Sequence, residues 1–319
     1  MTPTEAAEAR AAGYRLLAQL LQGPLTAELV AAAAIDPRLV TTQALDDLAV
    51  QHLSAFEQGA FPHAGVFLED EPGVGGATAT ACADLWRRLG LPEERWLSAP
   101  DHLGAHLHAL AWLCGAEADA HGDEAGDQAE RMRQLQGEVL DDLLRWLPQW
   151  VIAVDDGWCA ALATVIGELT VHHRLALMAS GVPLPLPADD GPGAQDLDLT
   201  ALDTGVREIA SFLAAPARCG LLLTSRHITT ICRALDTPAG FGPRRQRLGT
   251  LLRSAARFKT WPALIEQLLG TVQHTEAALR GAPWIDLEGL TVGALRRLTH
   301  TRGALRALRL SRPDLLDPE

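Results

Sequence analysis

The chain has 319 residues, of which 48% are hydrophobic and 21% charged, and its formal net charge is −13 at pH 7. This composition excludes an intrinsically disordered chain and supplies enough apolar residues for two ordinary domains or one large helical body. Residues 1–204 carry 31 acidic residues and 10 arginines, whereas residues 205–310 carry 16 basic residues and 6 acidic ones. We expect an acidic N-terminal body and a basic C-terminal region, which either dock on each other or leave the acidic body to receive a basic ligand.

The N-terminal residues indicate a helix rather than a targeting signal. Thr2, Pro3 and Glu5 follow the pattern of an N-cap, a first-turn proline and a capping-box partner, and Gly23 ends the helix. A secretory signal would need an apolar run, but three charged residues stand among the first ten. No uncharged stretch is long enough to span a membrane. We therefore expect a cytoplasmic protein.

Apolar residues at helical spacing predict the following helices. In the acidic half the predicted ranges are 45–56, 132–147 and about 155–180. In the basic half they are about 200–214, 225–235, 243–258, 261–279 and 291–308. Sustained alternation of apolar and polar residues, the mark of a strand, does not occur. The sequence therefore predicts an all-α fold.

Seven of the thirteen residues from Gly181 to Gly193 are glycine or proline, which predicts a linker. We divide the chain into a helical domain over 1–180, a linker over 181–199, a smaller basic helical region over 200–310 and a tail over 311–319. The five cysteines are widely spaced without a Cys-x-x-Cys pair, as is typical of reduced core residues in a cytosolic protein.

The stretch SAPDHLGAH, residues 98–106, places polar groups at the start of an apolar helix. We expect Ser98 to be the N-cap, Pro100 to lie in the first turn and Asp101 to complete a capping box. His102 and His106 share a helical face, but two ligands do not close a zinc site and no adjacent glutamate provides a base. We therefore expect no metal site and no cofactor bound by the chain itself.

Motifs of catalysis and of nucleotide binding are absent from the sequence. There is no Gly-x-Ser-x-Gly elbow, and the glycines of 73–76 lack the Gly-Lys-Ser/Thr of a phosphate-binding loop. We therefore expect no enzyme. The basic run over 244–247 suits phosphate, yet the chain as a whole is acidic, so we expect a docking or solvated face rather than a nucleic-acid site. The alternative function is a helical regulatory or DNA-associated protein that uses this arginine-rich region.

Tryptophans at 86, 96 and 112 lie near the Pro-Asp-His triplet in sequence, among many acidic residues. Such aromatic residues usually belong to a core. If exposed, apolar walls with carboxylates at their rim would suit a basic, partly apolar peptide.

The order of several segments resembles one known family. FPHAGVFLEDE, ACADLWRRLGL, APDHLGAHLHALAWLC and WCAALATVIGELTVHH, within residues 10–180, are similar to the TorD/DmsD/NarJ group of redox-enzyme maturation chaperones. The family's Glu-Pro-x-Asp-His-Leu type signature, followed by Glu-Leu, is matched by PDHL at residues 100–103. The preceding acid is absent here, and His106-Leu107 stands in place of Glu-Leu. Residues beyond 200 show a fainter likeness to longer chaperones that accompany dimethylsulfide dehydrogenase-like reductases.

The resemblance implies a non-catalytic cytoplasmic chaperone that holds the apo catalytic subunit of a molybdopterin oxidoreductase until the molybdopterin cofactor is inserted. It also implies contact with the twin-arginine signal peptide of that subunit, with Asp101 receiving an arginine. On this basis we expect Asp101→Asn to weaken peptide binding with little change in stability. The sequence does not determine the oligomeric state, and a homodimer is one of the alternatives. The candidate peptide-binding residues are Pro100, Asp101, His102 and Leu103, with Trp86 and Trp96 as neighbours.

Overall fold

The computed structural model describes residues 2–122, 126–183, 204–281 and 283–310. Most of these residues lie in helices and none lies in a strand, which confirms the predicted all-α class. Most of the predicted linker and the whole predicted tail lie outside the described residues. No helix in the described ranges is long and apolar enough to cross a membrane.

Contacts divide the chain into two compact units. The N-terminal unit contains the described residues of Met1–Glu57, Phe61–Gly65 and Gly73–Pro187. The C-terminal unit contains those of Gln58–Ala60, Val66–Pro72 and Ala188–Glu319. Two short segments near residue 65 therefore group with the C-terminal unit, although they lie within the predicted 1–180 domain. The boundary at 181–199 stays a prediction.

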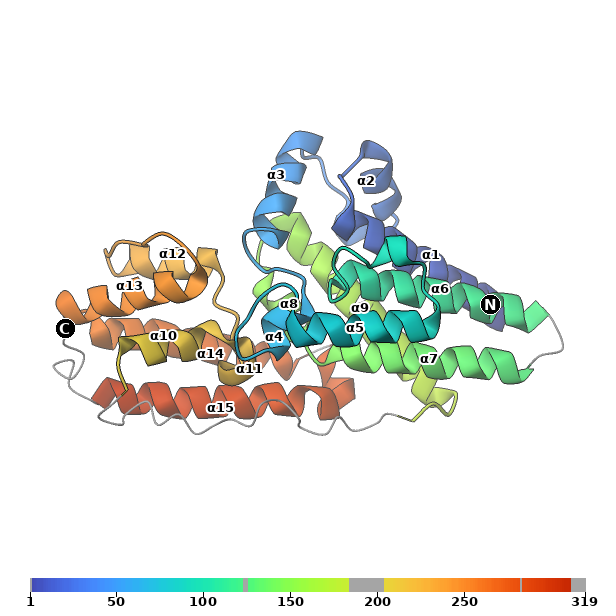
Figure 1. Ribbon diagram of the computed structural model, residues 1–319. Helices are drawn as coiled ribbons and strands as arrows, with labels where there is room; N and C mark the ends of the chain where they lie inside the picture. Colours follow the sequence, from blue (N-terminus) through green and yellow to red (C-terminus); the bar gives the residue numbers. More distant parts are fainter. Residues whose placement is uncertain (1, 123–125, 184–203, 282, 311–319) are drawn as a thin grey trace. The chain divides into compact units, whose positions relative to one another are not determined.

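Helices α1–α3 and α5–α9 belong to the N-terminal unit, and the short α4 carries the chain from one unit to the other (Figure 1). Their bounds are α1 Pro3–Gln22, α2 Ala27–Ala33, α3 Leu45–Phe56, α4 Ala64–Leu68, α5 Gly76–Leu89, α6 Leu103–Gly122, α7 Gly126–Leu144, α8 Leu147–Ala153 and α9 Gly157–Ala179. Two 3-10 turns, Pro37–Leu39 and Glu93–Arg95, lie between them.

Helix α1 starts as its sequence predicts. The Glu5 amide donates to the Thr2 hydroxyl at 3.2 Å, and the Thr2 amide donates to the Glu5 carboxylate at 2.7 Å. This capping box satisfies two backbone groups that the first turn leaves unpaired, and Gly23 ends the helix. The buried face of α1 then packs against α6 over much of its length.

Helix α6 is the central helix of the N-terminal unit, because it packs extensively on both α1 and α7. Most residues from Leu103 to Ala120 are buried. A stripe remains partly or fully exposed, at His108, Trp112, Gly115, Ala116 and Asp119. A helix that is apolar on nearly all sides is expected to be enclosed by neighbours, and α6 is.

The predicted helix over 132–147 is wrong at its C-terminal end. Helix α7 stops at Leu144, and α8 begins at Leu147 with Pro148 in its first turn. Pro148 has no amide to donate to the carbonyl of Leu144 and would clash with it in a continuous helix. The chain therefore breaks at Trp146 and starts a new helix, where the proline is tolerated.

The helices of the C-terminal unit follow the predicted ranges closely. Three of them begin and end within one residue of the prediction. Helix α10 begins at Val206, six residues after the predicted start near 200, and α15 begins three residues earlier than predicted. The short α11 was not predicted. Their bounds are α10 Val206–Ala214, α11 Pro216–Cys219, α12 Ser225–Ala234, α13 Arg244–Arg257, α14 Trp261–Leu279 and α15 Glu288–Leu310, with a 3-10 turn Trp284–Leu287.

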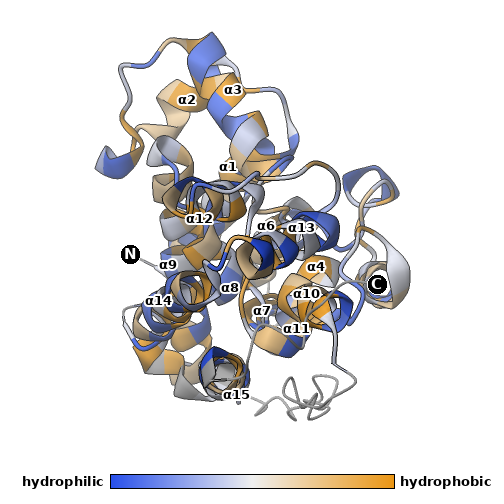
Figure 2. Cartoon of the chain, turned by 90° about the vertical axis from the view of Figure 1, so that its left-hand side faces the viewer, coloured by the Kyte–Doolittle hydropathy of each residue, from blue (hydrophilic) through white to orange (hydrophobic). Residues whose placement is uncertain are grey.

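The core of the C-terminal unit forms where α10 packs on α13 and α14 packs on α15. The indole of Trp261 is buried and donates to the carbonyl of Leu308 at 3.1 Å, which fixes the start of α14 to the end of α15. Figure 2 shows hydrophobic and hydrophilic stretches alternating along helices such as α3 and α10, as amphipathic helices require. All five cysteines are buried and free, which confirms their prediction as core residues.

Candidate functional site

The Pro-Asp-His triplet lies in a turn where two helices of the chain begin. The amide of Leu103 donates to the carbonyl of Pro62 at 2.8 Å, and the amide of Ala64 donates to the carbonyl of Asp101 at 2.9 Å. These bonds flank an isolated antiparallel bridge between His63 and His102. Helices α4 and α6 start directly after the two bridged segments.

The predicted helix start at Ser98 is wrong. Helix α6 begins at Leu103, so that His102 occupies the N-cap position and its Nδ1 accepts from the Gly104 amide at 3.0 Å. Residues 96–102 form successive turns instead, with Ala99 donating to the carbonyl of Trp96 and His102 to that of Ala99. Pairing with 62–64 holds residue 101 out of the helix, so the capping box of Ser98 and Asp101 does not form.

Asp101 is fully buried and stabilises the turn from within. Its Oδ2 accepts from the Gly65 amide at 3.1 Å, and its Oδ1 lies 3.2 Å from Nδ1 of His63. Burial raises the pKa of Asp101, but the hydrogen bonds from His63 and Gly65 outweigh it and hold the pKa below its usual value. The carboxylate therefore stays charged and caps the first turn of α4.

This burial changes the expected result for Asp101→Asn. The amide of asparagine replaces one acceptor oxygen with a donor, which faces either the Gly65 amide or His63. Because hydrogen bonds to charged groups contribute about 1.5–3 kcal/mol, we expect the free energy of unfolding to fall by about 2–3 kcal/mol in urea titrations. Asp84→Asn is the matched control, since Asp84 is exposed and its ion pair with Arg87 contributes less than about 1 kcal/mol. Equal stability of the Asp101 variant and the native chain would contradict this reading of the turn.

Of the six predicted binding residues, four are buried and two are partly exposed. Trp86, Trp96, Leu103 and Asp101 are enclosed, whereas Pro100 and His102 reach the surface. The Trp86 indole donates to the carbonyl of Pro100 at 2.8 Å. Burial, together with the charge of His63, lowers the pKa of His102 to about 3, so its ring is neutral near pH 7. The buried indole of Trp86 therefore supports the turn, whereas the buried indole of Trp96 donates to the carbonyl of Leu91 at 3.0 Å.

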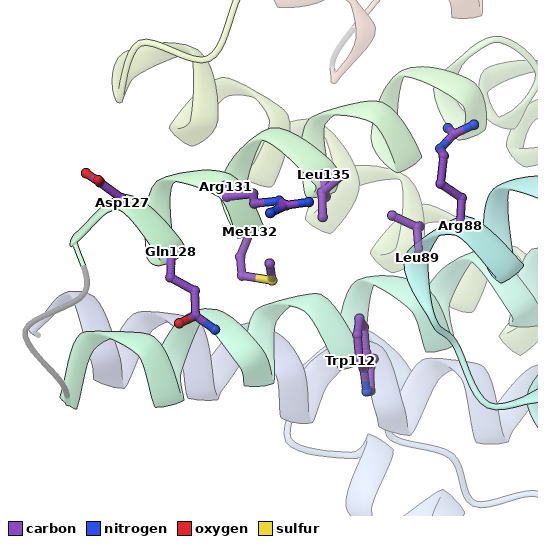
Figure 3. Close-up of a pocket in the computed structure, with 8 residues that line it drawn as sticks. All are labelled: Arg88, Leu89, Trp112, Asp127, Gln128, Arg131, Met132 and Leu135. Atoms are coloured by element: carbon purple, nitrogen blue, oxygen red, sulfur yellow. The ribbon is translucent and has the colours of Figure 1, made fainter.

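A groove lies between α5, α6 and α7 and has a volume of about 500 Å³. Figure 3 shows Trp112 on one side, a row of α7 side chains on the other and Leu89 at one end. Trp112 is 41% exposed. The lining residues are Arg88, Leu89, Trp112, Asp127, Gln128, Arg131, Met132 and Leu135.

The groove combines apolar walls with a mixed-charge rim. Leu89, Trp112, Met132 and Leu135 supply the apolar surface, and a methionine adapts to partners of different shape. An exposed tryptophan beside such a wall is typical of an anchor for another protein. Trp112 was not among the predicted binding residues, although the stripe of small and polar residues at 108, 115, 116 and 119 places it on the outer face of α6.

The basic run over 244–247 lies at the start of α13 in the C-terminal unit. Arg247 donates to the hydroxyl of Thr229 at 2.8 Å and to the carbonyl of Ser225 at 3.3 Å. Its guanidinium therefore joins α13 to α12. The expected docking role of the run, rather than contact with nucleic acid, stays a prediction.

Comparisons with known proteins agree with the resemblance seen in the sequence. The model of the family described as "Nitrate reductase delta subunit" matches residues 8–151. The selenate reductase assembly chaperone protein of Thauera selenatis is 31% identical over 186 residues, which represent 53% of this chain and 90% of that protein. No solved structure matches the chain significantly. Since the similarity extends over nearly the whole of this relative, the chain belongs to the NarJ/TorD-type chaperone family, that of the nitrate reductase delta subunit, and is a chaperone and not an enzyme.

Proposed function

We propose that the chain is a cytoplasmic assembly chaperone for a molybdopterin oxidoreductase. It binds the apo catalytic subunit, through the twin-arginine signal peptide of that subunit, and keeps it from export until the molybdopterin cofactor has been inserted. The observation that carries this proposal is the 31% identity across 90% of a reductase assembly chaperone. The cofactor is bound by the client and not by this chain.

The N-terminal unit offers two surfaces for such a peptide. The groove of α5, α6 and α7 suits the apolar segment of a signal peptide, with Trp112 as the anchor. The turn presents Pro100 and His102, and it follows the exposed Glu93 and Glu94, whose carboxylates suit the arginines. Asp101, Leu103, Trp86 and Trp96 act in this proposal as the buried support of the turn.

The test of the groove is Trp112→Ala. The side chain is 41% exposed and borders the groove, so its removal takes away apolar contact with the client while leaving the core intact. Truncating an interface anchor costs about 2 kcal/mol or more, which corresponds to at least about 30-fold weaker binding. Isothermal titration with a twin-arginine signal peptide, and with the apo catalytic subunit, measures this change.

Phe241→Ala is the matched control, because Phe241 is a 93% exposed aromatic residue in the C-terminal unit. It should leave affinity for both ligands unchanged. If Trp112→Ala binds both ligands as the native chain does, the groove is not the client-binding surface.

The alternative of a DNA-associated protein rests on the excess of ten positive charges over residues 205–310. Titration with duplex DNA at two salt concentrations separates the two functions, since binding to phosphates weakens steeply with salt. The chaperone proposal predicts peptide binding and weak DNA binding. Strong, salt-sensitive DNA binding without peptide binding would favour the alternative. A homodimer is a separate expectation, which sedimentation of the full chain tests.

A further inference from the structure

Three side chains from three helices converge in the N-terminal unit. Cys82 of α5, His106 of α6 and Asp142 of α7 bring a sulfur, a nitrogen and an oxygen atom within 4.8 Å of one another. Nε2 of His106 lies 3.1 Å from Oδ2 of Asp142, and Sγ of Cys82 lies 4.0 Å from the same oxygen. The first two residues are buried, and the side chain of Asp142 is 27% exposed.

The orientation of His106 distinguishes this group from a catalytic relay. Its Nδ1 lies 3.2 Å from the carbonyl oxygen of His102, so Nδ1 carries a proton and donates it there. In a nucleophile–base–acid relay the thiol and the carboxylate occupy opposite nitrogens of the ring. Here the other two side chains gather around Nε2. A backbone carbonyl that holds Nδ1–H is instead the usual outer partner of a metal-binding histidine.

The surroundings shield this point from bulk water on one side. The rings of Trp86 and Trp146 pack edge-on against His106, with centroids 5.0 and 5.9 Å away. The exposed part of Asp142 leaves an approach from solvent, and Arg145 holds its other oxygen at 3.5 Å. The three side chains thus combine an imidazole held in one orientation, an apolar side formed by two tryptophan rings and access from solvent at Asp142.

We propose that Cys82, His106 and Asp142 bind a divalent transition ion, Zn²⁺. Thiolate, imidazole and carboxylate are all zinc ligands, and bond lengths of about 2.0–2.3 Å in a tetrahedral site place ligand atoms roughly 3.3–3.6 Å apart. The distances of 3.1 and 4.0 Å lie on either side of that range, and the third pair, Sγ of Cys82 and the ring nitrogen of His106, lies within 4.8 Å, so side-chain shifts of up to roughly 1 Å close the site. The ion displaces the protons of Nε2 and Sγ, and water takes the fourth position beside Asp142.

This site departs from the sequence-based expectation that His102 and His106 bind no metal. His102 is not a ligand, because its Nδ1 accepts from the Gly104 amide. The two missing ligands come from residues 24 positions before His106 and 36 after it, which helical spacing does not reveal. Since α5, α6 and α7 also line the groove, a bound ion would join the three helices that form its walls.

The experiment uses the full chain, purified without an affinity tag and with its thiols reduced. Titration with Zn²⁺ against a chromophoric chelator gives the affinity, and Co²⁺ reports a thiolate ligand through its charge-transfer absorption. We expect one ion per chain, a thiolate–Co²⁺ band and a higher thermal midpoint with Zn²⁺. Loss of a residue that only hydrogen-bonds to a metal ligand lowers metal affinity about 10–100-fold. Since Cys82 is a ligand itself, Cys82→Ser should weaken Zn²⁺ binding at least about 100-fold and abolish the thiolate–Co²⁺ band.

Cys159→Ser is the matched control, since Cys159 is an equally buried cysteine on α9 outside the group. It should keep both the affinity and the band. Asp142→Asn is the second variant, because its partly exposed side chain is tolerant of change, and it should also weaken binding. A native chain that binds no Zn²⁺, or Cys82→Ser and Asp142→Asn variants that bind it as tightly as the native chain, would overturn the proposal.

Discussion

His173 and His102 together should lower the free energy of unfolding by about 4 kcal/mol between pH 7 and pH 5. Burial lowers the pKa of His173 and of His102 to about 3 each, against about 6.5 in the unfolded chain. Below pH 6.5 both histidines are therefore protonated in the unfolded chain but stay neutral in the folded chain. The stabilisation is present above pH 6.5 and is lost as the pH falls from there toward 3, at about 1.4 kcal/mol per histidine for each pH unit.

The contacts of His173 explain why it stays neutral. The Nε2 group of Gln136 donates to the Glu117 carboxylate at 3.0 Å, so its Oε1 faces His173 and accepts from Nε2–H at 2.9 Å. Nδ1 is then the acceptor for the Tyr14 hydroxyl, also at 2.9 Å. A second proton on the ring would oppose the hydroxyl proton of Tyr14 in a buried site.

Urea titrations at pH 7, 6 and 5 measure this change. His173→Gln should lower stability at pH 7, since it disturbs the buried bonds, but it should also make the loss between pH 7 and pH 5 smaller by about 2 kcal/mol. His172→Gln is the matched control at the neighbouring, exposed position and should leave the pH dependence unchanged. An equal loss between pH 7 and pH 5 in His173→Gln and in the native chain would show that the ring of His173 is not held neutral.

Replacing Arg174 by methionine should destabilise the N-terminal unit by about 3–5 kcal/mol. The guanidinium is fully buried and donates to both oxygens of Asp141, at 2.7 and 3.3 Å. It also donates to the carbonyls of Val182 and Pro183, at 3.4 and 2.6 Å. Removing one partner of a buried ion pair leaves the other charge without compensation, which is the origin of the large effect.

The measurement is the free energy of unfolding from chemical denaturation at pH 7. Arg88→Met is the control, because the pair of Arg88 with Glu138 is more than half exposed and contributes less than about 1 kcal/mol. Arg174 also holds residues 182 and 183, the last described residues at the start of the predicted linker. Limited proteolysis after residue 180 should therefore be faster in the Arg174 variant. If the free energy of unfolding of the Arg174 variant falls by less than about 1 kcal/mol, water solvates Asp141 as well as Arg174 does, and the prediction is wrong.

Local signals in the sequence predict most helices of this fold. Thr2 and Glu5 define the start of α1 through contacts within one turn, and the α14 range from Trp261 to Leu279 follows from its apolar spacing alone. Pro148, which ends the helix predicted over 132–147, is a local signal too. The start of α6, in contrast, depends on distant residues. Pairing of 62–64 with 101–103 moves the start of α6 from Ser98 to Leu103, and no pattern within 98–106 encodes it.

The candidate site was less accessible to sequence reasoning than the fold. The family signature includes Asp101, and Trp86 is a candidate only as its neighbour. Both are buried, because a signature does not distinguish a surface residue from its support. Trp112 carries the exposed aromatic surface instead. The partners of His106 come from α5 and α7, and only the packing of α6 against its neighbours brings those side chains to one point.

The binding of the full chain to the catalytic subunit of its proposed client, a molybdopterin oxidoreductase, tests the central claim most directly. Calorimetric titration is carried out with the apo subunit, with the cofactor-loaded subunit and with the apo subunit lacking its signal peptide. An assembly chaperone should bind the apo subunit at least about tenfold more tightly than the loaded one, a difference of about 1.4 kcal/mol, and should lose affinity when the signal peptide is removed. Equal affinity for the apo and loaded subunits, or no binding to either, would contradict the account.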